Sequence, residues 1–141
     1  MECAARKLDQ TFIHVASALY SYALSGIGLF AAGNAILHTW YIVKLWMPGP
    51  HDNAFERRMN VLMGTLLYTL PMVWRGDYLN FFKAFFVAGN IGSLAFIFSS
   101  RFNGWGHAVS HLAAAFFSHY LLLSAAQVPA SLGAAIDSCF I

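Results

Sequence analysis

One feature constrains the fold of this chain more than any other: thirty-four consecutive residues without a charged side chain. The stretch runs from Gln10 to Val43 and contains no Asp, Glu, Lys or Arg. A helix needs about 20 apolar residues to cross a bilayer, and charged side chains are rare in such a span because they are costly there. We therefore expect this region to form helices that lie inside a membrane.

The remainder of the chain has the same character. Hydrophobic residues make up 59% of the 141 residues and charged residues 10%, whereas roughly a quarter of the residues of a soluble domain are charged. We interpret the chain as an integral membrane protein with almost no soluble mass. Its basic residues are scattered along the sequence, so its net charge of +2 gives no indication of nucleic-acid binding. Two cysteines near the chain ends, Cys3 and Cys139, predict neither a disulfide framework nor a metal site.

Turn-forming residues divide the apolar sequence into five segments. As a single helix the first region would measure about 50 Å, whereas the hydrocarbon core of a bilayer is about 30 Å thick. Gly33-Asn34 offers a break, so we place two helices there. The second helix, of about 14 residues, fits a short span or a helix at the interface. The expected helices lie at about 11–33, 34–47, 60–74, 78–100 and 106–128.

The charges of the loops favour five spans over four. With five spans, one side of the membrane holds only Arg75 among the basic loop residues. With four spans, the basic loop residues divide almost evenly between the two sides. The positive-inside rule favours the biased arrangement. We therefore predict an all-α, polytopic membrane helix bundle of about five transmembrane helices in one domain, with four as the alternative. The N-terminal side, which is cytoplasmic, matrix or stromal, would hold five basic residues: Arg6, Lys7, Arg57, Arg58 and Arg101.

Histidines within the apolar segments are the candidate metal ligands. His107 and His111 are four residues apart and share a helix face, and a neutral imidazole is the commonest metal ligand in proteins. In the five-helix arrangement Asp9 and His14 enter the membrane from the same side as this pair. A metal site formed by His107, His111 and His14 is therefore one hypothesis, and hydrogen bonding of each histidine to a neighbouring helix is the other.

A second pair of histidines is the candidate for contact with an organic cofactor. With the break at Gly33-Asn34, His38 begins its helix near the opposite side of the membrane. His119 lies about 18 Å along its helix from His107 at 1.5 Å per residue. His38 and His119 therefore share a level in this arrangement. The sequence leaves the cofactor unknown, with zinc, haem and chlorophyll as the options.

The two ends of the chain carry motifs that resemble a known family. The first is Arg6-Lys-Leu-Asp9 with Tyr20-Ser21 behind it. The second is His107-Ala-Val-Ser-His111, an alanine run and His119-Tyr120. Both are similar to motifs of the progestin and adipoQ receptor/hemolysin III family, within the wider group that includes alkaline ceramidases. The five helices here would correspond to the third through seventh helices of that family.

The resemblance implies a zinc-dependent activity on lipids. It implies that His107 and His111 hold zinc, which activates water for hydrolysis of a lipid amide, and that Asp9 supports the ligands or acts as an acid/base group. The family takes its third zinc histidine from its second helix, which has no counterpart in this sequence. His14 is the residue that would replace it.

Three classes of function follow. The first is a non-catalytic accessory subunit of a larger membrane complex, with other membrane subunits and lipids as its partners. The host would be an energy-transducing complex of the mitochondrial inner membrane or the thylakoid. The second is the zinc-dependent hydrolase, or a receptor-like relative of it. The third is a small transporter with Asp9, Lys83 and Asn90 along its pathway. No Ser/His/Asp triad or carboxylate pair is evident, which favours the subunit over the enzyme.

Overall fold

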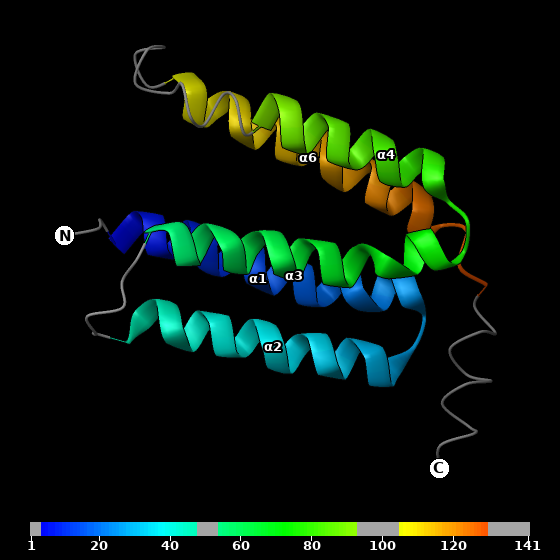
Figure 1. Cartoon of the computed structure of the whole chain (residues 1–141), viewed down its shortest axis with the longest axis horizontal. Coiled ribbons are helices and arrows are strands. Elements are labelled where there is room, and N and C mark those ends of the chain that lie inside the picture. The colour runs from blue at the N-terminus through cyan, green and yellow to red at the C-terminus, as the bar shows by residue number, and fades with distance from the viewer. Residues whose placement is uncertain (1–3, 48–53, 93–104, 130–141) are drawn as a thin grey trace. The chain divides into compact units, whose positions relative to one another are not determined.

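The computed structural model describes residues 4–47, 54–92 and 105–129, and all the regular structure in these ranges is helical (Figure 1). The expected all-α fold is therefore confirmed, with five helices, the fourth of which ends in a π-helical segment. In chain order the elements are α1 (Ala4–Ser25), α2 (Gly28–Trp46), α3 (Ala54–Trp74), α4 (Tyr78–Phe86) continued by η1 (Val87–Gly92), and α6 (Trp105–Ala125).

The contacts divide the chain into two compact units. The first unit comprises residues 1–71 and 128–141, and so contains α1, α2 and most of α3. The second unit comprises residues 72–127 and contains α4, η1 and α6.

In the first unit, α1 and α2 form an antiparallel hairpin (Figure 1). Gly26 adopts a positive φ of 66°, a conformation that costs a side-chain-bearing residue about 1–2 kcal/mol. Its amide donates to the carbonyl of Tyr22 at 2.8 Å, and the Ser25 hydroxyl accepts from the amide of Ile27 at 3.1 Å. The turn therefore ends α1 and lets α2 begin at Gly28.

The position of this turn corrects the break expected from the sequence. Gly33 and Asn34 lie inside α2, where the Asn34 side-chain amide donates to the carbonyl of Phe30 at 3.0 Å. The helix continues through Gly33 and Asn34 because the side-chain amide of Asn34 bonds to a carbonyl of the same helix and does not cap its end. The second helix is consequently longer than expected, at 19 residues, or about 28 Å. The helices expected from residues 11 and 60 also begin earlier, at Ala4 and Ala54.

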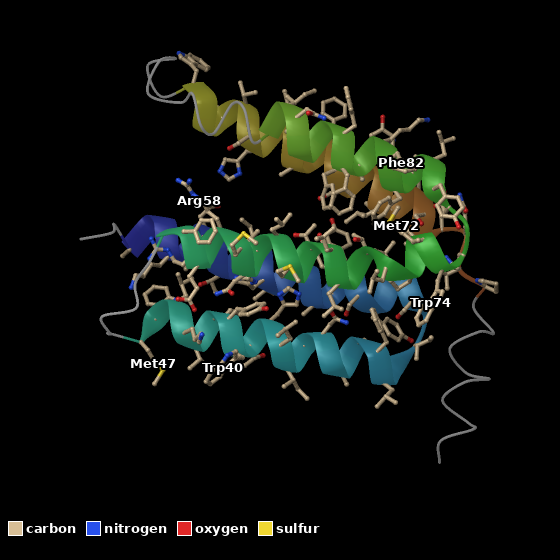
Figure 2. The ribbon with its side chains drawn as sticks, viewed as in Figure 1. Trp40, Met47, Arg58, Met72, Trp74 and Phe82 are labelled. Atoms are coloured by element: carbon tan, nitrogen blue, oxygen red, sulfur yellow. The ribbon has the colours of Figure 1, made fainter. Side chains whose placement is uncertain are left out.

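The described side chains have an inverted distribution of polarity. Large apolar side chains are exposed on every helix, among them Ile36 at 73%, Trp74 at 81% and Trp105 at 72%. Figure 2 shows Trp40 and Met47 pointing away from α1 and α3. Buried side chains are as often polar as hydrophobic, and the buried polar ones are His14, Ser17, Ser21, Ser25, Asn34, His38, Thr69 and Ser124.

Most of the buried hydroxyl groups bond to their own helix. Ser17 and Ser25 donate to the carbonyls of Ile13 and Ser21, four residues earlier, at 2.8 and 2.7 Å. Thr69 does the same in α3, to Thr65 at 2.8 Å. A hydroxyl that bonds back in this way satisfies its donor without a partner helix or water. These side chains can therefore be packed between helices at little cost.

The second unit packs α4 and η1 against α6. The rings of Phe85 and Phe117 meet edge to face with their centroids 6.0 Å apart. A Cβ at Gly92 would lie 3.3 Å from the Cβ of Ala113, so the helices approach closely at these small residues. By length and apolarity, the one described helical stretch that meets the requirement for crossing a bilayer is Ala108–Ala125 in α6, with a mean hydropathy of 1.3. Five spans therefore stay a prediction.

Candidate functional site

A pair of buried histidines forms the centre of the first unit. The Nδ1 atoms of His14 in α1 and His38 in α2 lie 3.0 Å apart, and the residues are 4% and 1% exposed. At this distance one Nδ1 carries a proton and donates it, and the other accepts with its lone pair. The two rings therefore have different roles in one hydrogen bond.

The hairpin brings these two histidines to the same level. Gly26, at the turn, is twelve residues from His14 and twelve residues from His38. Residues equally far from the turn of an antiparallel hairpin lie at equal heights, because both helices rise 1.5 Å per residue. The position of the glycine turn thus sets the pairing.

Aromatic rings and a glycine enclose the pair. The ring of Tyr41 in α2 lies 5.4 Å from that of His14, and the ring of Tyr68 in α3 lies 6.2 Å from that of His38. A Cβ at Gly64 in α3 would lie 2.6 Å from the Cε1 atom of His38. Glycine at this position therefore lets the imidazole rest directly on the backbone of α3.

Two buried polar atoms of α2 have no hydrogen-bond partner in the described part of the chain. They are the Oδ1 atom of Asn34 and the Nε2 atom of His38. A buried polar atom without a partner costs about 1–3 kcal/mol, and such atoms are uncommon in native proteins. Asn34 precedes His38 by four residues, so the two side chains share a face of α2. These atoms mark the pair as the candidate functional site.

The metal ligands expected from the sequence are distributed over both units. His14 pairs with His38 in the first unit, whereas His111 lies exposed on α6 in the second unit. The side chain of His107 lies outside the described residues. Among the described side chains, no group of three or more His, Cys, Asp or Glu residues is arranged to hold a metal ion. The zinc site of His14, His107 and His111, with Asp9 beside it, thus stays a prediction.

The first unit gives His38 a partner that was not expected from the sequence, and the contact of His38 and His119 with a cofactor stays a prediction. His38 bonds to His14, and His119 lies exposed on α6, its ring 5.5 Å from that of Tyr120. Sequence reasoning missed the pairing because the break at Gly33 put His38 near the start of a helix. The Gly26-Ile27-Gly28 sequence was the signal for the correct turn.

A second polar cluster lies at one end of the second unit. Arg75 Nη2 donates to the hydroxyl and the carbonyl of Ser124 at 2.9 and 3.2 Å, and the side-chain amide of Asn80 donates to Asp77 at 3.0 Å. Burial raises the pKa of Asp77, but hydrogen bonds with Ser124 and Asn80 and the charge of Arg75 outweigh it, so the pKa lies below its ordinary value. A cation at the C-terminus of a helix is stabilising. This cluster has a structural role, because it fastens the end of α6 to the turn after α3.

Comparison with known proteins finds no similarity: no family model matches this chain, and neither does any curated protein or solved structure. The resemblance to the progestin and adipoQ receptor/hemolysin III family is therefore still a hypothesis that rests on its two motifs.

Proposed function

We propose that this chain is a polytopic membrane protein that serves as a non-catalytic accessory subunit of a larger membrane complex. Its helices would cross the bilayer, and its apolar outer surfaces would contact lipid and the helices of other subunits. We place the complex in an energy-transducing membrane of a mitochondrion or plastid.

The inverted polarity of the molecule carries this proposal. Exposed Trp, Phe, Leu and Ile side chains on every helix are favourable against lipid and unfavourable against water. The buried hydroxyl groups that bond back to their own helices suit an environment without water. Tryptophans also stand at helix ends: Trp46 closes α2, Trp74 closes α3 and Trp105 opens α6. Tryptophan is enriched at the two membrane interfaces.

Polar groups on the outside of the second unit favour a subunit over an isolated protein. Asn90 in η1 and His119 in α6 are exposed. Asn90 lies twelve residues after the start of α4, and His119 lies six residues before the end of α6. A polar group inside a bilayer is expensive unless a neighbouring helix bonds to it. Exposed phenylalanines of the second unit, Phe82 and Phe86 in α4 and Phe116 in α6, would pack against that helix.

The experiment is native electrophoresis of gently solubilised membranes, followed by purification through a tag on this chain. We expect the chain in a band far heavier than its own 15.6 kDa, together with other subunits and with haem or chlorophyll absorbance. Introduction of a photo-crosslinking residue at Asn90 or His119 should join the chain to one of those subunits. The matched control places the photo-crosslinking residue at Ile36, an exposed apolar position of the first unit. We expect that variant to crosslink mainly to lipid.

Other results would contradict the proposal. Migration as a small particle, or crosslinks from both positions only to the chain's own first unit, would show that no partner covers these groups. A small particle with one zinc ion per chain that is lost in His107→Ala and His111→Ala would instead support the lipid amide hydrolase.

A further inference from the structure

We propose that His14 and His38 bind a cuprous ion, Cu⁺, between their Nδ1 atoms. This site goes beyond the role of an accessory subunit, which needs no metal, and it uses His14, which the zinc site expected from His107, His111 and His14 would also need. The inference begins with the convergence of two ring nitrogens at 3.0 Å in the interior of the first unit.

The tautomers that this site requires are compatible with the surroundings of α2. Phe30 presents a carbonyl oxygen, which only accepts, so the side-chain NH₂ of Asn34 faces it and Oδ1 is turned away. The unpartnered atom of Asn34 is thus an acceptor. If the unpartnered Nε2 of His38, one helical turn further on, carries the proton, it offers a donor on the same face of α2 as this acceptor. In this tautomer the Nδ1 of His38 directs a free lone pair at His14.

Binding of the ion needs no net release of protons. In the metal-free pair, His14 holds its proton on Nδ1 and donates it to His38. When the ion enters, the proton leaves Nδ1 of His14 and a proton is taken up on Nε2 of the same ring. Both imidazoles are then neutral, each with a lone pair on Nδ1 for the metal, and the site gains one positive charge from the ion.

The charge of the surroundings favours a monovalent ion. The ring contacts of the pair are to two tyrosines, Tyr41 and Tyr68, and no set of three acidic, thiol or histidine ligands exists among the described residues. A divalent ion held by two neutral imidazoles would bring two uncompensated charges into the interior, and each is costly there. Imidazole is a good ligand for copper, and a cuprous ion is satisfied by two ligands.

The geometry requires a small adjustment. Metal–imidazole bonds are about 2 Å long, so two nitrogens on opposite sides of one ion stand about 4 Å apart. The pair must therefore open by about 1 Å from the 3.0 Å of the hydrogen bond. Rotation of the side chains, chiefly of His14, would supply this shift, because the ring of His38 rests on the backbone of α3. Asn34 Oδ1 would then accept from Nε2 of His38 and orient its ring, as neighbours of metal-bound histidines commonly do.

The test uses the purified full-length chain with Cys3 and Cys139 alkylated, so that thiols do not take up the ion. The protein is dialysed without oxygen against Cu⁺ kept reduced by ascorbate, and bound copper is measured together with X-ray absorption. We expect one copper per chain with two nitrogen ligands at about 2 Å. His14→Gln and His38→Gln should each weaken binding by at least about tenfold. Loss of a group that only orients a metal-bound histidine already weakens binding by about 10–100-fold, and loss of the ligand itself should cost no less.

Two further variants make the test specific. Asn34→Leu should keep the stoichiometry but weaken binding by about 10–100-fold, the usual effect of losing a group that orients a metal-bound histidine. His51→Gln, on a histidine that none of the proposed sites uses, should bind as the wild type does. Binding that is absent from the wild type, that is lost in His51→Gln, or that shows fewer than two nitrogen ligands would overturn the proposal. If His14→Gln or His38→Gln fails to fold, the wild-type spectrum and the weaker binding of Asn34→Leu together carry the test.

Discussion

Single side chains determine the interior of the first unit. Asn34 and His38 present buried polar atoms, and Gly64 provides the space in which the imidazole of His38 lies on α3. The histidines were visible in the sequence as candidate ligands. Their surroundings were not, because nothing in the sequence indicates that a glycine of α3 faces a histidine of α2.

The role of Gly64 can be tested by adding one methyl group. In Gly64→Ala the new Cβ would lie 2.6 Å from Cε1 of His38, so the ring or α3 must move. Overpacking of this kind costs about 1–3 kcal/mol, and we expect a lower free energy of unfolding in detergent micelles. Gly33→Ala is the matched control, because a Cβ there meets nothing within 4 Å; it should be neutral or slightly stabilising.

The cause of the destabilisation is separable from helix propensity. If the clash with His38 is responsible, the double variant Gly64→Ala/His38→Ala should show little additional loss over His38→Ala alone. Equal losses from Gly64→Ala in the presence and absence of His38 would argue against this contact.

Among the elements, the α1–α2 turn has the largest consequence. Gly26→Ala forces a side chain into a left-handed conformation at φ 66°, and we expect a loss of about 1–2 kcal/mol in unfolding experiments. Gly26→Asn should lose less, since asparagine tolerates this conformation better than alanine does. A loss in Gly26→Asn as large as that in Gly26→Ala would show that packing, and not the backbone, requires the glycine.

The stability of the polar contacts between the end of α6 and the α3–α4 turn should depend on pH through Asp77. The pKa of Asp77 is lower in the folded protein than its ordinary value of 3.8. Its stabilising contribution is therefore present above about pH 4 and is lost as the pH falls through the folded value. Thermal unfolding should find the wild type more stable than Asp77→Asn at neutral pH, with the difference shrinking towards pH 3. A difference that stays constant over this range would exclude the carboxylate charge as its cause.

The five-span topology is a prediction about the whole molecule. If five helices cross the bilayer, the N-terminus and the end of α2 lie on one side, and the start of α4 lies on the other. Three chains with a single cysteine test this: native Cys3 alone, Met47→Cys and Tyr78→Cys, the last two with Cys3 and Cys139 replaced by Ser. Met47 and Tyr78 are both exposed.

An impermeant thiol reagent added from one face of sealed vesicles should label Cys3 and Met47→Cys together and Tyr78→Cys only from the opposite face. With four spans, and α2 lying at the interface, Cys3 and Met47→Cys would be labelled from opposite faces. That result would remove the charge-bias argument for five helices.

The all-helical fold followed from the sequence, because long apolar runs with few charges are typical of membrane helices, whose backbone groups all bond within one segment. The position of the break did not follow. Gly33-Asn34 and Gly26-Ile27-Gly28 are both plausible turns in sequence, and only the structure shows Gly26 with a positive φ and Asn34 bonded within α2.

The position of this turn determines which residues form the candidate site. With the break at Gly33-Asn34, the residue opposite His38 would have been Leu29, fifteen residues or about 22 Å along the helix from His14. With the turn at Gly26 the two histidines meet at 3.0 Å. Composition and helical propensity act over a few neighbouring residues, and the sequence by itself therefore determined the class of structure. The pairing of side chains across a hairpin depends on where the chain reverses, and only the tertiary structure decided it.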